Sequence, residues 1–330
     1  MNRKETYGSA IRSAFEYLLD NHPEVFVIGQ GLWSPWYVGE TMTDLDKRYG
    51  KDRIIDTPVS ESACTGMAVG ASLCNSKPIV VHPRIDFMLY AIDAVVNQAA
   101  KWSHMTGAQS SPGMTIRAII NRGGEQGAQH SQSLHSWFSH IPGLKVVMPY
   151  SVEDARDMLI ASVLDPSPVI YIDDRWLYDQ TKELGEIKEK KLSEFAPQII
   201  KSGSQITIAA TSYSSLLAKE STYELEKMNI SSEVIDIRTL NPFNPSLVIE
   251  SVKKTGNLVV VDGSWKNSGF AAEVISSVTE ILSPLDIKFK ARRVHLPDSP
   301  APTATPLEKI FYPSAELIVR EVKAMLDDSS

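Results

Sequence analysis

The chain is poor in cysteine. Only two of its 330 residues are cysteines, Cys64 and Cys74. On one helix they would lie about 15 Å apart at 1.5 Å per residue, which is too far for a disulfide. We interpret both as small free thiols, and such sparing use of cysteine predicts a cytoplasmic protein.

Several motifs that mark common classes of protein are also lacking. The chain has no GxGxxG opening a helix, no GxxxxGK[ST] loop, no His/Cys spacing typical of zinc and no GxSxG elbow. These absences disfavour nucleotide-phosphate binding, a zinc site and an α/β-hydrolase. No apolar run approaches the roughly 20 residues that span a bilayer, and the N-terminal residues lack a signal-peptide core, so no membrane contact is predicted.

Basic surface charge is lacking as well. The formal net charge is −7 and the sequence pI is about 5.6, and no stripe of basic residues occurs. This balance argues against a nucleic-acid partner. With 43% hydrophobic and 22% charged residues, the composition is that of a globular protein. A length of 330 residues suggests two domains.

Short β-branched runs alternate with longer amphipathic ones, which predicts an α/β fold with mostly parallel sheets. In the first half the expected strands cover 25–29, 78–82, 115–120, 144–148 and 168–172, and the expected helices cover 6–21, 61–74, 90–103 and 151–164. After a charged stretch the second half repeats the pattern, with strands at 206–210, 233–237, 257–263 and 289–294 and helices at 213–228, 245–255, 268–282 and 314–327.

The pattern therefore predicts two doubly wound domains, 1–175 and 204–330, joined by an exposed linker, 176–203. The proline-rich stretch 297–306, PDSPAPTATP, is incompatible with a regular helix or a central strand. We expect it to be an ordered surface crossing rather than a disordered linker.

One acidic residue, Glu61, stands where an extended segment turns into a helix, in the sequence DTPVSESACTG. Ligands of open α/β sheets gather at such strand-to-helix connections. The simpler interpretation is an acid favoured by the helix dipole.

Two other clusters follow buried strands. The loop RGGEQGAQHSQS, 122–133, contains three glycines that allow sharp bends, followed by Gln129 and His130. His130 is suited to acid–base work, although a loop histidine is often only a surface or capping residue. The segment VHPRIDF, 81–87, supplies His82, Arg84 and Phe87, where Phe87 is either core or a stacking surface for a flat ring.

Several motifs, in order along the chain, together resemble the β subunit of the thiamine-diphosphate-dependent decarboxylating component of 2-oxo-acid dehydrogenases. They are DTPVSESACTGMAVGAS, AIDAVVNQAAKW, GAQHSQS, HIPGLKVVMP and DIRTLNPFN. The pyruvate, branched-chain and acetoin dehydrogenases are examples of this family. The resemblance implies a pyrimidine-binding α/β domain followed by a transketolase-type C-terminal domain.

The resemblance also implies roles for particular residues. Glu61 matches the glutamate that hydrogen-bonds the aminopyrimidine ring of the cofactor, and Phe87 matches the aromatic residue packed on that ring. Gln129 matches a cofactor-binding position, and His130 matches the active-site histidine on the thiazolium side. A structural potassium site made of backbone carbonyls is implied at Met114, Ser162, Val163, Asp165 and Ser167.

The family's motif for diphosphate and magnesium, GDG followed by paired Asn, is lacking, and VDGSWKN at 261–267 has neither its place nor its spacing. In the family this half of the site, with Mg²⁺, belongs to an α subunit. The resemblance therefore implies an α₂β₂ heterotetramer, active only when both chains are present.

Two departures from the family pattern bear on the substrate. The loop from Arg122 to His130 is shorter than usual, and His82 and Arg84 stand where apolar or small residues are common. Arg84 can bind a carboxylate or phosphate of an atypical substrate, or pair with Asp86 or with the partner chain. The shorter loop and these two residues together indicate a divergent branch of the family.

The resemblance implies decarboxylation of a 2-oxo acid and transfer of the acyl group to a lipoyl acyltransferase. A split transketolase or an acyloin-forming ketolase is the alternative within the enzyme class. A catalytically silent assembly subunit is the alternative outside it.

Overall fold

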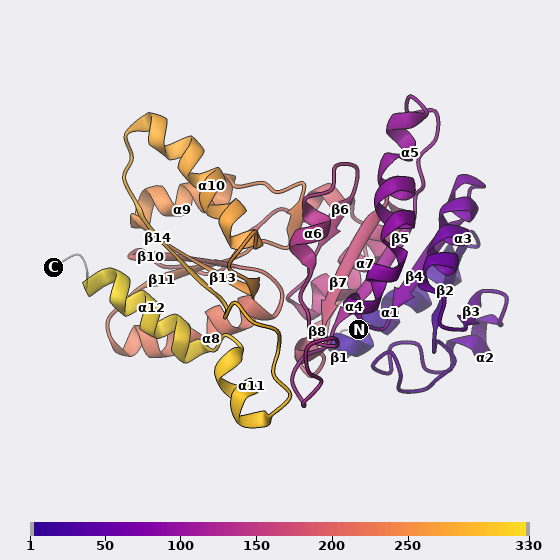
Figure 1. The fold of residues 1–330 in the computed structure, drawn as a ribbon, viewed down its shortest axis with the longest axis horizontal. Helices are drawn as coiled ribbons and strands as arrows, with labels where there is room; N and C mark the ends of the chain where they lie inside the picture. Colours follow the sequence, from indigo (N-terminus) through magenta and orange to yellow (C-terminus); the bar gives the residue numbers. More distant parts are fainter. Residues whose placement is uncertain (1–2, 328–330) are drawn as a thin grey trace. The chain divides into compact units, whose positions relative to one another are not determined.

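The computed structural model describes residues 3–327, which fold into two α/β units. Unit 1 comprises Met1–Asn121 and Trp137–Phe195, and unit 2 comprises Arg122–Ser136 and Ala196–Ser330. In Figure 1, which is coloured along the sequence, the segment between β5 and α6 belongs to unit 2, although the residues on both sides of it belong to unit 1. The loop that carries Gln129 and His130 thus packs with the second half of the chain. No helix among residues 3–327 has the length and apolar character needed to cross a membrane.

Unit 1 contains a parallel sheet covered by helices. The strands of unit 1 are β1 (Arg3–Thr6), β2 (Val25–Gln30), β3 (Ile54–Thr57), β4 (Lys77–His82), β5 (Thr115–Ile120), β6 (Lys145–Val147), β7 (Val169–Asp174) and β8 (Thr181–Leu184). Of these, β1 and β8 pair antiparallel as a separate two-stranded sheet. The helices of unit 1 are α1 (Tyr7–Asn21), α2 (Leu45–Tyr49), α3 (Glu61–Leu73), α4 (Ile85–Met88), α5 (Ala100–Met105), α7 (Val152–Leu164) and the short turns η1 (Leu89–Ala91), η2 (Ala94–Ala99), η3 (Arg175–Leu177) and η4 (Leu192–Glu194). Helix α6 (His135–Ser139) lies where the chain re-enters unit 1.

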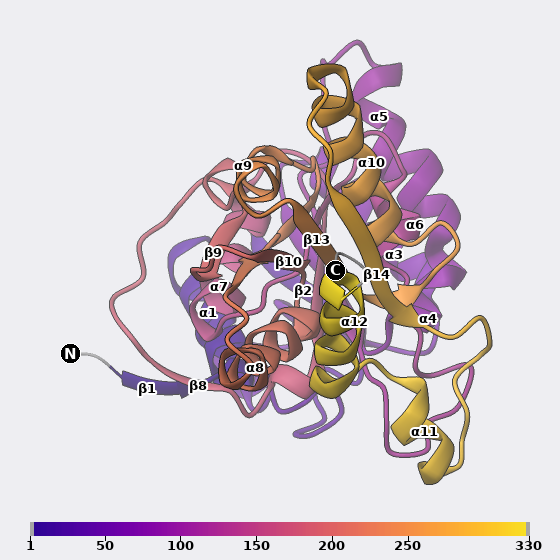
Figure 2. The same ribbon diagram turned by 90° about the vertical axis from the view of Figure 1, so that its left-hand side faces the viewer.

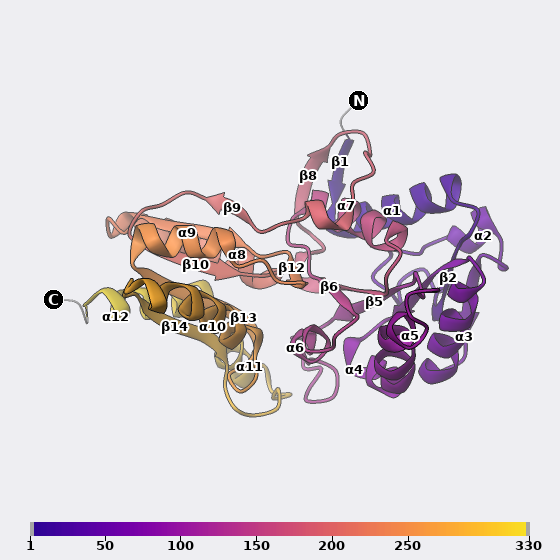
Figure 3. The ribbon, with the colours of Figure 1, turned by 90° about the horizontal axis from the view of Figure 1, so that it is seen from above.

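The unit 1 strands of the parallel sheet follow the order β6-β7-β5-β4-β2-β3, and each of these neighbouring pairs is parallel. Helices α1 and α7 lie on one face and α3 and α5 on the other (Figure 3). Strands covered on both faces need apolar side chains throughout, and β5 and β7 are buried along their whole length. Arg117 is tolerated in β5 because it forms a bidentate pair with Asp173, at 3.0 and 2.8 Å.

Unit 2 contains the second sheet. The strands of unit 2 are β9 (Gln198–Lys201), β10 (Ile206–Ala210), β11 (Ser232–Asp236), β12 (Thr239–Asn241), β13 (Asn257–Trp265) and β14 (Lys290–Leu296), and all but β12 form the second sheet. The helices of unit 2 are α8 (Tyr213–Lys227), α9 (Ser246–Thr255), α10 (Phe270–Leu282), η5 (Ser283–Leu285), α11 (Thr305–Phe311) and α12 (Ala315–Asp327). The sheet order is β14-β13-β10-β11-β9, with only β9 antiparallel to its neighbour, and α9 and α10 lie on the face opposite α8 and α12 (Figure 2).

The α/β fold predicted from the alternation is confirmed, and the predicted strands of both halves coincide with β2, β4–β7, β10, β11, β13 and β14. Three local features differ from the expectation. The predicted helix 90–103 contains a π-helical stretch, η2. The stretch 176–203 contains β8, η4 and β9. The proline-rich stretch gives way to α11 at Thr305, because proline is acceptable in a helix's first turn.

Candidate functional site

Glu61 is the first residue of α3 and follows β3 after a three-residue connection, as predicted. Pro58 lacks the N–H that would continue the strand ladder. The carbonyl of Ser60 accepts the hydrogen bond from Cys64 N at 3.0 Å that starts the helix. The Glu61 carboxylate thus lies at the positive end of a helix dipole.

A small pocket opens beside Glu61, at the carboxyl ends of three neighbouring parallel strands. Its lining residues are Gly29, Gln30, Thr57, Pro58, Ser60, Glu61, Cys64, Val80, Val81, His82 and Pro83. The register pairs Gln30 with Thr57 and Gly29 with Val81, so the ends of β2, β3 and β4 are level. Strand-end pockets of this kind bind ligands in open α/β folds.

The lining combines apolar walls with a few polar groups. Pro58, Val80 and Val81 provide apolar surface, and Gln30, Thr57, Glu61 and His82 provide hydrogen-bonding groups. Among residues 3–327 no group donates a hydrogen bond to the Glu61 carboxylate, although Glu61 lines the pocket. The space enclosed by this lining is about 10 Å³, so it suits the polar edge of a heteroaromatic ring rather than a whole ring.

His82 is the second predicted residue that the structure brings to this pocket. It is 2% exposed, and burial lowers its pKa to about 4. Its Nε2 lies 3.3 Å from Thr65 Oγ1. At neutral pH the imidazole is therefore uncharged, and it faces the pocket as a hydrogen-bonding group rather than as a cation.

We expect the buried His82 to make stability depend on pH. The unfolded chain binds a proton at this residue below about pH 6.5, whereas the folded chain does so only below about pH 4. Between these values the unfolded state binds more protons, so the free energy of unfolding falls with falling pH, by about 3 kcal/mol in total. Urea unfolding of His82→Asn should therefore show a flatter pH profile than that of the wild type, and exposed His140→Asn is the control. Equal pH slopes for His82→Asn and the wild type would contradict a buried neutral imidazole.

Asp56, at the end of β3, was not predicted as part of the site. Its carboxylate accepts hydrogen bonds from the backbone N–H groups of Gly31 at 2.6 Å and Leu32 at 3.3 Å. Gly31 has a φ of +73°, and at Gly29 a Cβ would lie only 2.4 Å from Val81 O. Asp56 and the two glycines thus shape the turn beside the pocket. The only sequence signal was the position of Asp56 five residues before Glu61.

Arg84 and Phe87 lie just beyond the pocket's lining. Arg84 caps α4, and Phe87 is within this short helix rather than in an open loop, as its backbone N–H bonds to Arg84 O at 3.2 Å. Arg84 is partly buried, and burial together with nearby Arg175 lowers its pKa. Asp86 opposes this shift, so charges of both signs surround Arg84.

Gln129 and His130 lie on loop 122–136, which belongs to unit 2. Gly123, Gly124 and Gly127 all have positive φ, as the bends require. Two contacts hold the first half of the loop. Arg122 Nη1 donates to Gly263 O at 3.3 Å, and Glu125 N donates to the Glu308 carboxylate at 3.0 Å.

A buried pair, His135 and Asp262, holds the other end of the loop and was not predicted. His135 Nε2 lies 3.0 Å from Asp262 Oδ1, and Ser133 Oγ lies 3.0 Å from His135 Nδ1. Asp262 also accepts hydrogen bonds from Ser264 N and Ala271 N, each at 3.0 Å. Burial opposes ionisation of Asp262, but His135 and these N–H groups lower its pKa overall. The Asp of VDGSWKN therefore anchors a loop in this structure.

Comparisons with known proteins agree with this architecture. The Transketolase, pyrimidine binding domain family matches residues 3–180, and the Transketolase, C-terminal domain family matches residues 197–318. The pyruvate dehydrogenase E1 component subunit beta of Saccharomyces cerevisiae mitochondria is 35% identical over 97% of this chain and 88% of its own length. The chain belongs to the pyruvate dehydrogenase E1 β-subunit family.

Other relatives also match nearly the whole chain. The E1 subunit beta of Rickettsia felis is 34% identical over 96% of this chain and 97% of its own length. Among solved structures, a chain described as split gene transketolase, inactive beta4 tetramer, has a TM-score of 0.77 at 20% identity and covers 98% of both chains. At that identity the likeness shows a shared fold alone.

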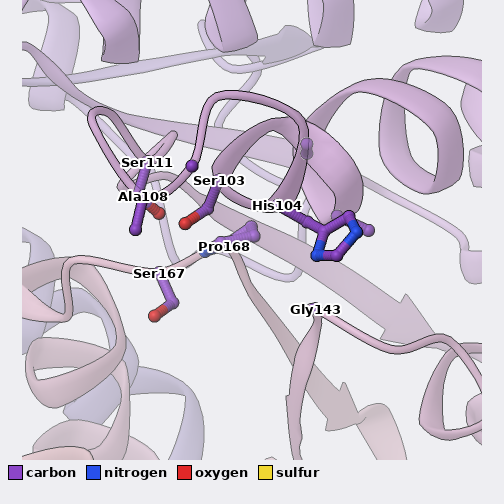
Figure 4. A pocket seen from close by; sticks show the side chains of 10 residues that line it. Ser103, His104, Ala108, Ser111, Gly143, Ser167 and Pro168 are labelled. Carbon is purple, nitrogen blue, oxygen red and sulfur yellow. The ribbon is translucent and has the colours of Figure 1, made fainter.

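A further pocket of unit 1, of about 470 Å³, lies at the opposite edge of the sheet (Figure 4). Ser111, Gly143, Ser167 and Pro168, which line it, precede β5, β6 and β7. It therefore lies at the amino ends of the strands, away from the edge where α/β sheets bind cofactors. The pocket beside Glu61 is the stronger candidate.

Proposed function

We propose that this chain is the β subunit of a thiamine-diphosphate-dependent 2-oxo-acid dehydrogenase, which decarboxylates a 2-oxo acid and transfers the acyl group to a lipoyl acyltransferase. The observation that carries the proposal is the carboxylate of Glu61 at the start of α3, bordering the pocket at the ends of β2, β3 and β4. Membership of the E1 β-subunit family supports the same activity.

The pocket's residues fit the aminopyrimidine part of thiamine diphosphate. Glu61 would share a proton with a ring nitrogen, and the apolar walls would exclude water from that hydrogen bond. The bound cofactor supplies the nucleophilic carbon and the electron sink for decarboxylation. Phe87 would pack on the pyrimidine ring, and Gln129 would bind the cofactor.

The remaining roles concern substrate and partner. His130 would transfer a proton or hydrogen-bond the reacting group, and Arg84, with the neutral His82, would contact an anionic group of the substrate. The diphosphate and Mg²⁺ would be held by an α subunit in an α₂β₂ assembly. The cytoplasmic location remains a prediction.

Co-expression with a candidate α subunit tests the proposal. With thiamine diphosphate and Mg²⁺ present, we expect one or more 2-oxo acids to reduce an artificial electron acceptor only when both chains are present. Each chain alone serves as the control, because the β chain lacks the diphosphate-binding motif.

Three other outcomes would contradict the proposal. Ketol formation from an aldehyde acceptor without dye reduction would indicate the acyloin-forming ketolase. Ketol transfer between sugars would indicate the split transketolase. Assembly with the α subunit but no turnover of any 2-oxo acid or ketol substrate would indicate a silent subunit.

A further inference from the structure

A lysine from a distant part of the chain caps the C-terminal end of α7. Lys77, the first residue of β4, donates from Nζ to the carbonyl oxygens of Val163 at 3.2 Å and Leu164 at 3.3 Å. A helix leaves its last carbonyls without an internal partner, and they form the negative end of its dipole. The ammonium group therefore lies where a free cation would otherwise be attracted.

A second lysine holds the loop that follows. Lys145, the first residue of β6, donates to both carboxylate oxygens of Asp165 at 2.7 Å. Asp165 Oδ1 also accepts from Ser167 N at 2.9 Å, which closes the turn before β7. The ammonium groups of Lys77, from β4, and Lys145, from β6, thus both lie beside the connection between α7 and β7.

The topology explains why both lysines arrive at this place. In a parallel sheet all amino ends of the strands lie at one edge, and α7 must return the chain to that edge before β7 can begin. Lys77 and Lys145 are the first residues of their strands, and Lys145 is in register with Val169, the first residue of β7. The Lys77 side chain is partly buried, which lowers its pKa, while Glu24 and Asp165 oppose that shift.

The same connection contains most of the positions at which family resemblance implies a potassium ion. The carbonyl of Met114 accepts a hydrogen bond from Val169 N at 3.0 Å, and that of Val163 accepts one from Lys77. The carboxylate of Asp165 is paired with Lys145. This donor set does not fit a potassium ion, because the Lys77 ammonium already occupies the Val163 carbonyl and would repel a further cation, while the Lys145–Asp165 pair leaves no net negative charge to attract one.

We propose that the Lys77 ammonium takes the place of a bound cation at the C-terminal end of α7. The connection between α7 and β7 is therefore ordered without potassium. The inference concerns folding stability and is independent of the proposed enzymatic activity.

Thermal unfolding of the full chain tests this inference in KCl, NaCl and choline chloride at equal ionic strength. The wild type should have one Tm in all three salts. Lys77→Ala should lower Tm by about 2–4 °C in choline chloride. KCl should restore part of that loss, because the exposed carbonyls then attract a free cation.

Two control variants isolate the effect. Lys77→Arg keeps the charge and should unfold alike in all three salts. Lys182→Ala removes the exposed ion pair with Glu153 at the other end of α7 and should change Tm little.

A wild-type Tm that rises in KCl above its value in both NaCl and choline chloride would overturn the inference. A Lys77→Ala variant that matches the wild type in every salt, or one that loses the same stability in all three, would also overturn it. The wild-type measurement decides the question even where the variant does not fold.

Discussion

Replacement of Glu61 by Gln is expected to lower the turnover of the assembled enzyme by about 10²–10⁴-fold, the usual contribution of a positioned acid–base group. The amide keeps the size of the side chain but cannot share an acidic proton with a ring nitrogen. Steady-state turnover with saturating thiamine diphosphate and the preferred 2-oxo acid measures the loss.

The folded chain should tolerate this change. Among residues 3–327 no group donates a hydrogen bond to the Glu61 carboxylate, so the substitution removes only its interaction with the dipole of α3, worth about 0.3–1 kcal/mol.

Glu153→Gln is the matched control, because Glu153 is also an acid in the first turn of a helix, α7, but does not border the pocket. It should retain full turnover. Wild-type turnover in Glu61→Gln would exclude a role for this carboxylate in cofactor activation.

Replacement of Asp262 by Ala is expected to destabilise the chain by about 3–5 kcal/mol, because several buried donors lose their acceptor and each such loss costs about 1–3 kcal/mol. His135 loses its hydrogen bond to Asp262, and the backbone N–H groups of Ser264 and Ala271 lose an acceptor that is 2% exposed. Urea unfolding monitored by circular dichroism measures the change.

A neighbouring acid provides the control for this second prediction. Glu273 lies in the first turn of α10 and is exposed, so Glu273→Ala should change the free energy of unfolding by about 0.5 kcal/mol or less. Equal stability of the two variants would show that the His135–Asp262 pair does not anchor loop 122–136.

The free energy of unfolding at acid pH is a second measurement that tests the same pair. The pKa of Asp262 in the folded chain is below the ordinary value of 3.8. Its contribution is therefore present above about pH 4 and is lost as the pH falls through the folded pKa. Asp262→Asn should lack the loss of stability that protonation of Asp262 causes in the wild type.

Much of the fold was predictable because its signals are local. Alternating apolar runs such as PIVVH and TIRAII require burial on both faces, and they became β4 and β5. The start of α3 was also predictable, because Pro58, Ser60 and Glu61 determine it within four residues. The role of Asp56 was not, because its hydrogen bonds reach Gly31 and Leu32 across the sheet.

The sequence by itself determined two α/β halves, the position of Glu61 at a strand-to-helix connection and the glycines that bend loop 122–136. Only the tertiary structure decided that this loop packs with unit 2, that His82 is buried and neutral, and that Lys77 closes α7. His135 and Asp262 are 127 positions apart, and Lys77 and Val163 are 86 apart. Such pairs depend on which distant segments the fold brings into contact, and local periodicity carries no information about that.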